Sequence, residues 1–137
     1  MEARINNDCV NYINKVVMDA TGECEIGGIL LGTRADKKIV VLEVVEISSI
    51  TDSTYSYSLD GDLATEIANA SNLEFVGIWH SHINSCEHFS TADEKVNVEL
   101  AGIFGGIISV LVVSDKNEPL KVFAYLIDED GETKRCL

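Results

Sequence analysis

The sequence predicts a single mixed α/β domain over residues 1–137, with a mixed central β-sheet flanked by helices. A length of 137 residues suits one domain and leaves no room for two. With 46% apolar and 24% charged residues, the composition is typical of a folded globular chain. Segments with helical spacing alternate with short Val- and Ile-rich runs, but without a strict strand–helix–strand rhythm.

The N-terminal part predicts a helix followed by two paired strands. Apolar residues recur near helical spacing from about residue 6 to residue 20, and Thr21-Gly22 would end this helix. Residues 26–32 predict a buried strand, in which Gly27-Gly28 indicates a bend or a close approach of two backbones. Residues 38–50, rich in Val and Ile, predict a second strand paired with the first.

The middle of the chain predicts a second helix and a central strand. Residues 52–57 are polar and predict a loop that runs into a short edge strand. Residues 60–70 place Leu63, Ile67 and Ala70 on one helical face, with Asp60 or Asp62 available as the N-cap. Residues 74–80 predict an apolar strand, and a polar loop is expected over residues 81–89.

The C-terminal part predicts a third helix and two further strands. The helix is expected to begin near Ser90, and the strands span residues 106–113 and 121–127. Between the strands, residues 115–119 include the single proline of the chain, Pro119, and predict a turn.

The charge of the chain excludes some partners. It carries 23 acidic and 10 basic residues, giving a net charge of −13. A nucleic-acid-binding protein needs a cationic surface, and an anionic membrane would repel this chain, so we expect neither partner. A partner with a basic surface or tail would instead be attracted.

No targeting or membrane-spanning segment is recognisable. Residues 1–8 lack the basic-then-apolar order of a signal peptide. The longest nearly apolar run, residues 100–113, is too short for a bilayer and contains glycines. We therefore expect the protein in the cytoplasm.

The cysteines give no metal or redox motif of their own. Cys9, Cys24, Cys86 and Cys136 form no C-x-x-C pair, which argues against a zinc ribbon or a thioredoxin-like site. We expect reduced and mostly packed thiols, with a disulfide as the alternative in a thermophile.

The segment with the strongest chemical signal is His80-Ser81-His82, followed after seven residues by Ser90-Thr91-Ala92-Asp93. Side chains two apart at a strand end point to the same face, so both imidazoles can converge on one cation. Asp93 lies in the first turn of the next helix, and two histidines with one carboxylate are a normal ligand set for catalytic zinc. Ser90-x-x-Asp93 is also the spacing of a helix capping box, and the two interpretations are compatible.

A second segment, Glu23-Cys24-Glu25-Ile26-Gly27-Gly28, places a carboxylate at the entrance to a buried strand. Hydrolysis at zinc needs a carboxylate that moves protons without being a ligand. Taken alone, Glu25 would be an ordinary exposed residue before a strand.

Together the two segments resemble the JAMM motif of the JAB/MPN metalloprotease family: Glu25-x-x-Gly28-Ile29-Leu30-Leu31-Gly32, then His80-Ser81-His82-x7-Ser90-x-x-Asp93. The resemblance implies an MPN/JAB-type fold in which His80, His82 and Asp93 bind one Zn²⁺, with water as the fourth ligand. It implies that Glu25 takes a proton from this water and passes it to the leaving amine, while Ser90 hydrogen-bonds the oxyanion. Ser81, between the histidines, receives no chemical role.

The chain departs from the family pattern at two positions. Ile83 and Phe89 stand where proline is frequent, so the loop is expected to be less rigid. In the same loop, His88 and Cys86 are expected to be a solvated histidine and a surface thiol, with modulation of the metal as the alternative for each.

Four aromatic residues are expected to lie near the site in the folded chain. Trp79 and Phe75 are explained by core packing. Tyr55 and Tyr57 are expected on a half-buried edge strand, and the alternative is that they line a groove for an extended peptide tail.

The resemblance implies a zinc-dependent isopeptidase or peptidase, similar to a deubiquitinase. It would cleave after the C-terminal glycine of ubiquitin or a ubiquitin-like protein whose extended tail ends in Gly-Gly. The alternative is an MPN-fold binding module that acts through a protein partner without catalysis. Other zinc hydrolases are disfavoured because the chain has neither a His-Glu-x-x-His nor a Pro-Cys-x-x-Cys motif.

Overall fold

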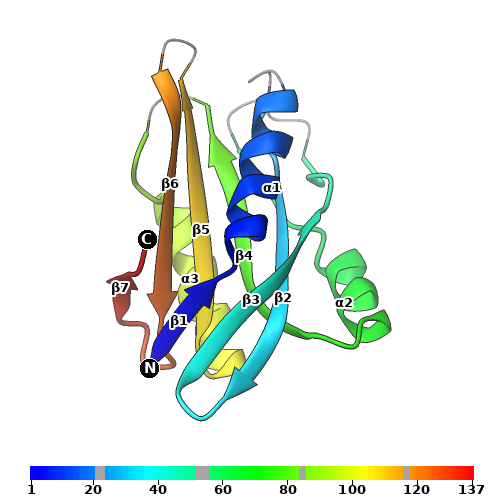
Figure 1. Cartoon of the computed structure of the whole chain (residues 1–137), viewed down its shortest axis with the longest axis vertical. Helices are drawn as coiled ribbons and strands as arrows, with labels where there is room; N and C mark the ends of the chain where they lie inside the picture. Colours follow the sequence, from blue (N-terminus) through cyan, green and yellow to red (C-terminus); the bar gives the residue numbers. More distant parts are fainter. Residues whose placement is uncertain (21–23, 52–55, 84–85, 116–117) are drawn as a thin grey trace.

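The computed structural model describes residues 1–20, 24–51, 56–83, 86–115 and 118–137. Within these residues the chain forms one seven-stranded sheet and three helices (Figure 1). The elements are β1 (Glu2–Ile5), α1 (Asn7–Asp19), β2 (Gly27–Ala35), β3 (Lys38–Glu46), α2 (Gly61–Ala70), β4 (Glu74–His82), α3 (Thr91–Phe104), β5 (Ile107–Asp115), β6 (Glu118–Ile127) and β7 (Thr133–Arg135).

The sheet is mixed, which confirms the predicted fold class. Its strand order is β1-β3-β2-β4-β5-β6-β7. The pairs β1–β3 and β4–β5 are parallel, and the other neighbouring pairs are antiparallel. Strand β4 therefore lies at the centre of the sheet, where both of its edges are hydrogen-bonded and its position is firmly defined.

Helices cover both faces of the sheet. Helix α1 packs on one face, where Cys9, Ile13 and Val17 are buried against Leu30 and Trp79. Helix α3 lies behind the sheet in Figure 1 and α2 lies beside β2 and β3, and both pack in the layer opposite α1. Two hydrophobic layers thus enclose the central strands, as expected for a sheet of this kind.

The start of α2 confirms one of the two predicted N-caps, and the predicted end of the first helix at Thr21-Gly22 lies outside the described residues. The Asp60 carboxylate accepts a hydrogen bond from the Leu63 N–H at the start of α2. At the end of α3, Gly105 adopts a left-handed conformation with φ 77°, which glycine tolerates without strain.

Several predicted boundaries were wrong. Strand β3 ends at Glu46 rather than at residue 50, and β4 continues through His82 because its pairing with β5 extends to Val113. Residues 56–60 form no strand, so Tyr57 does not lie on the expected edge strand, and Tyr55 lies outside the described residues. Pro119 belongs to β6, and residues 116–117 of the predicted turn lie outside the described residues. The short strands β1 and β7 were not predicted.

The four cysteines are free, as predicted, but they are not mostly packed. Only Cys9 is buried, whereas Cys24, Cys86 and Cys136 are exposed. Burial raises the pKa of the Cys9 thiol, and the nearby Asp8 and Glu43 carboxylates raise it further.

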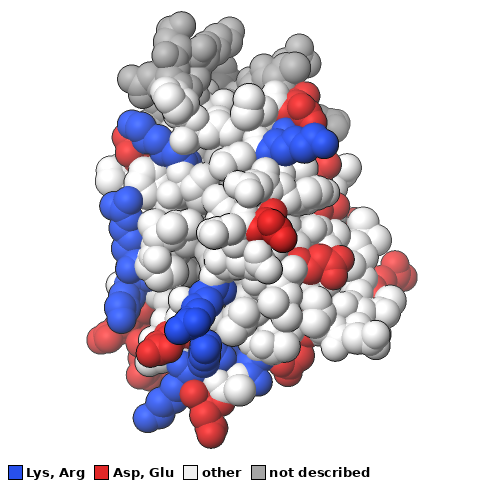
Figure 2. Space-filling model, viewed as in Figure 1, with Lys and Arg blue, Asp and Glu red and all other residues white. Residues whose placement is uncertain are grey.

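Charged side chains of both signs lie on the side of the molecule that α1 covers. Figure 2 shows lysine and arginine side chains along the margins of this side, with some carboxylates among them and others nearer its centre. No helix among the described residues is both long and apolar enough to cross a membrane.

Candidate metal centre

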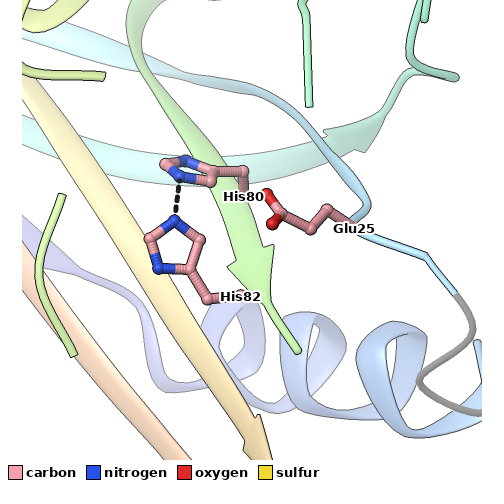
Figure 3. Close-up of side chains that lie close together, drawn as sticks. All are labelled: Glu25, His80 and His82. Atoms are coloured by element: carbon pink, nitrogen blue, oxygen red, sulfur yellow. Dashed lines mark hydrogen bonds between the residues drawn. The ribbon is translucent and has the colours of Figure 1, made fainter. Parts of the chain in front are cut away.

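Two histidines converge at the end of β4. His80 and His82 alternate with Ser81 along the strand, so both imidazoles lie on the sheet face that α3 covers. Their side chains are buried, with 6% and 7% of each residue exposed. The two Nε2 atoms are 3.2 Å apart, and Figure 3 shows the rings turned toward each other. This confirms the predicted geometry of the His-x-His pair.

Asp93 joins the histidines from the first turn of α3. Its Oδ2 atom lies 3.2 Å from Nε2 of His80 and 3.4 Å from Nε2 of His82. The same oxygen accepts a hydrogen bond of 2.9 Å from the Ser90 N–H, while the Ser90 hydroxyl accepts one of 3.0 Å from the Asp93 N–H. The predicted capping box is therefore present, and it orients the Asp93 carboxylate toward the histidines.

The tautomer of His82 is fixed by the loop that follows β4. Nδ1 of His82 lies 3.0 Å from the carbonyl oxygen of Cys86. Because a carbonyl only accepts, Nδ1 must carry the hydrogen and donate it. In the neutral ring Nε2 then keeps its lone pair, and this nitrogen faces His80 and Asp93.

The three inward-facing atoms have the spacing of a tetrahedral zinc site. The His80, His82 and Asp93 atoms are separated by 3.2, 3.2 and 3.4 Å. A tetrahedral Zn²⁺ with ligands at about 2.0–2.1 Å holds its ligand atoms about 3.3–3.4 Å apart. Two imidazoles and one carboxylate are also a donor set that zinc prefers. The residues therefore fit a metal ion with an open fourth position.

Glu25 lies beside the histidines, although it is far from them in the sequence. One atom from each of Glu25, His80 and His82 lies within 4.8 Å of the others, and Figure 3 shows the Glu25 carboxylate directed toward the two rings. Only 7% of Glu25 is exposed. Burial raises its pKa, and the neighbouring His82 and His80 oppose part of this rise. This set of three could itself hold a metal, so Glu25 and Asp93 are both candidates for the third ligand.

Ser81 connects the strand of histidines to the segment that carries Glu25. Its hydroxyl accepts a hydrogen bond of 3.0 Å from the Ile26 N–H, and its own N–H donates to the Ile26 carbonyl at 2.8 Å. The residue after Glu25 is thus held to β4 at two atoms. The sequence assigned no function to Ser81, because a serine between two histidines gives no sign of a partner 55 residues away.

The charges of the site favour a cation. Burial alone would lower the pKa of His82, but the hydrogen bonds to Asp93 and Cys86 and the Glu25 carboxylate raise it to about 9. Burial would raise the pKa of Asp93, but hydrogen bonds from His80, His82 and the Ser90 N–H hold it well below its ordinary value. The raised pKa of His82 and the lowered pKa of Asp93 both mean that the surroundings stabilise a positive charge at this place.

Aromatic rings flank His80 on two sides. The Tyr57 ring lies nearly parallel to the imidazole, at 12°, with centroids 6.5 Å apart, and the Tyr57 hydroxyl donates to the Ile47 carbonyl at 2.7 Å. Gly27 makes room for this arrangement, because a Cβ there would lie 2.9 Å from both Tyr57 and His80. On the other side, Phe89 lies 6.0 Å from His80 and packs against Tyr125. Phe89 precedes Ser90 at a position where the family often has proline, and these ring contacts hold it in place.

Two neighbouring cavities, which share Leu59 and Leu100 in their linings, lie along α3, and one of them reaches the metal centre. The first, about 350 Å³, is lined by His80, Asp93 and Tyr57 and reaches Leu59 and Leu100. The second, about 670 Å³, continues from Leu59 and Leu100 between α2 and α3 and is mainly apolar. Tyr57 thus lines the first cavity from a loop, and a groove for a peptide tail at this place stays a prediction.

The remaining predictions for this region agree with the structure. Trp79 is fully buried, and its Nε1–H donates to the Val45 carbonyl. Phe75 packs against Phe104. His88 and Cys86 are exposed, as expected for a solvated histidine and a surface thiol. The sequence interpretation missed Asn97, which is buried one turn after Asp93. Its position, four residues after a candidate ligand, was the one sign in the sequence that this polar residue faces the site.

Comparison with known proteins gives the family. A family model described as prokaryotic homologues of the JAB domain matches residues 18–127, which include all five residues of the motif. The chain therefore belongs to the prokaryotic homologues of the JAB domain. No curated protein matches the sequence.

Solved structures support the fold. A protein of Desulfitobacterium hafniense superposes with a TM-score of 0.73 at 17% identity, covering 98% of this chain and 89% of its own. A protein of Salinibacter ruber superposes with a TM-score of 0.68 at 25% identity, covering 98% and 88%. Both similarities extend over nearly the whole chain, so the fold is shared from end to end.

Proposed function

We propose that the protein is a zinc-dependent peptidase or isopeptidase in which His80, His82 and Asp93 hold the metal and Glu25 moves protons. The observation that carries this proposal is the triangle of Nε2, Nε2 and Oδ2 atoms, whose sides match those of a tetrahedral zinc site. Asp93 is the better third ligand because its oxygen completes that triangle, whereas Glu25 is constrained only to within 4.8 Å. A hydrolytic site also needs one carboxylate that stays free of the metal.

Bound Zn²⁺ supplies Lewis acidity and lowers the pKa of a coordinated water. The chain supplies the rest of the chemistry. The Glu25 carboxylate accepts a proton from the attacking water and returns it to the leaving amine. Its raised pKa lies closer to neutral pH than that of an exposed glutamate, which suits this exchange. The Ser90 hydroxyl accepts from the Asp93 N–H and still has its own hydrogen to donate to the oxyanion of the tetrahedral intermediate.

As substrate we propose ubiquitin or a ubiquitin-like protein with an extended tail that ends in Gly-Gly. The two neighbouring cavities support this, since the first suits a narrow tail and the second suits an apolar surface of the folded substrate. The net charge of −13 favours a tail with basic residues. A cytoplasmic location stays a prediction.

The test combines metal content with cleavage of ubiquitin-like fusion proteins. Purified protein is loaded with Zn²⁺, and the wild type is compared with Glu25→Gln, which keeps the size of the side chain and removes its basicity. We expect Glu25→Gln to bind one equivalent of zinc with wild-type affinity and to lose cleavage by about 10²-fold or more. His88→Ala is the matched control, because His88 is an exposed histidine outside the site.

Two outcomes would contradict the assignment. Loss of zinc in Glu25→Gln would make Glu25 the ligand. Zinc binding by the wild type without cleavage of any ubiquitin-like fusion, unchanged in Glu25→Gln, would support a binding module instead.

A further inference from the structure

Helix α3 carries the proposed ligand Asp93, and its apolar residues do not all lie on the face that meets the sheet. Its buried residues are Asn97 and Ala101, which follow Asp93 at intervals of four and form one ridge. Leu100 and Phe104 pack beside this ridge, whereas Val96, Val98 and Ile103 are largely exposed. Because apolar residues also lie on exposed sides of the helix, hydrophobic burial does not by itself single out one rotation about its axis.

One polar contact breaks this ambiguity. The Ser109 hydroxyl donates to Oδ1 of Asn97 at 2.9 Å, with Ser109 0% and Asn97 3% exposed. Ser109 lies in β5 beside Ile78 of β4, in the same sheet layer as the histidines. A buried polar pair that separates leaves both partners without water, so only one rotation of α3 satisfies it. A single buried polar residue fixes register in coiled coils by the same reasoning.

We propose that the Asn97–Ser109 hydrogen bond sets the rotation of α3 and thereby places the Asp93 carboxylate against His80 and His82. Asn97 and Ser109 are thus positioning residues for the metal centre, and this inference rests on the proposed metal site. A small rotation of α3 is enough to displace the Asp93 carboxylate, because a side-chain group about 5–6 Å from the helix axis moves about 1 Å for a rotation of about 10°. Functional sites tolerate only about 0.5 Å of such movement.

The test separates placement of the ligand from stability of the fold. In Asn97→Leu/Ser109→Ala both polar groups are replaced by apolar ones, a change that is often neutral or stabilising for folding. We expect this variant to melt at or above the wild-type temperature without metal, yet to bind Zn²⁺ at least tenfold more weakly in a chelator competition. With Co²⁺ as a spectroscopic probe, its visible absorption bands should shift or weaken.

Single variants keep the test decisive if the double variant does not fold. Ser109→Thr keeps the hydroxyl and should keep zinc affinity, whereas Ser109→Ala should lose it. Ile13→Val, in α1 on the opposite face, should lose stability but keep zinc affinity and the Co²⁺ spectrum.

Unchanged zinc affinity and Co²⁺ spectrum in the double variant, or equal affinities of Ser109→Ala and Ser109→Thr, would overturn the inference. Failure of the wild type itself to bind Zn²⁺ would refute the metal site instead, so the two ideas fail in different ways.

Discussion

The affinity of the site for zinc should depend steeply on pH, and His82 is the reason. Its Nε2 must be free of hydrogen to bind a metal, but its pKa in the metal-free protein is raised to about 9. At pH 7 the ring is therefore protonated in about 99% of molecules, and Zn²⁺ must displace this proton. The apparent affinity should fall about tenfold for each pH unit well below 9, and about 50-fold between pH 9 and pH 7.

The sign follows from the contacts of the ring. Burial acts against the protonated form, but Asp93, the Cys86 carbonyl and Glu25 all stabilise the imidazolium. Protonation and metal binding therefore compete for the same Nε2 atom. An unperturbed histidine, with a pKa of about 6.5, would give almost no dependence over this range.

The measurement is a competition between the protein and a chromophoric chelator from pH 6.5 to pH 9.5, corrected for protonation of the chelator. Calorimetry in two buffers with different heats of ionisation should show the release of about one proton per zinc at pH 7. His88→Ala is the control and should leave both results unchanged, because His88 is exposed and outside the site. A constant affinity between pH 7 and pH 9, with no proton released, would refute this reasoning.

Three further predictions follow from individual contacts. Ser90→Ala removes the cap of α3 and the proposed oxyanion donor; we expect a loss of about 1 kcal/mol in urea denaturation and of about 10²-fold in kcat. Gly27→Ala places a Cβ 2.5 Å from the Trp79 carbonyl oxygen and should cost about 1–3 kcal/mol, whereas Gly102→Ala, with open space around it, should stabilise α3 by about 0.5–1 kcal/mol. Removal of metal by a chelator should lower Tm, since zinc at about 1,000 times its Kd adds about 4 kcal/mol of stability; an unchanged Tm would mean that no metal is bound.

Local patterns determined most of the fold. The three helices and the five long strands have their own apolar periodicity or long apolar runs, so their existence was predictable. Strands β1 and β7 are short and largely exposed, and they are strands only because β3 and β6 pair with them. Such edge strands leave little signal in the sequence.

The candidate site divides in the same way. The sequence by itself determined the His-x-His pair and the Ser90–Asp93 capping box, because their geometry depends on residues two or three positions apart. Only the tertiary structure decided how these parts meet. The β2–β4 register that pairs Gly27 with His80 brings Glu25 to the histidines, and the contact between Asn97 and Ser109 joins α3 to β5. Hydrogen bonds between distant segments form only when the sheet is assembled, and no local spacing encodes them.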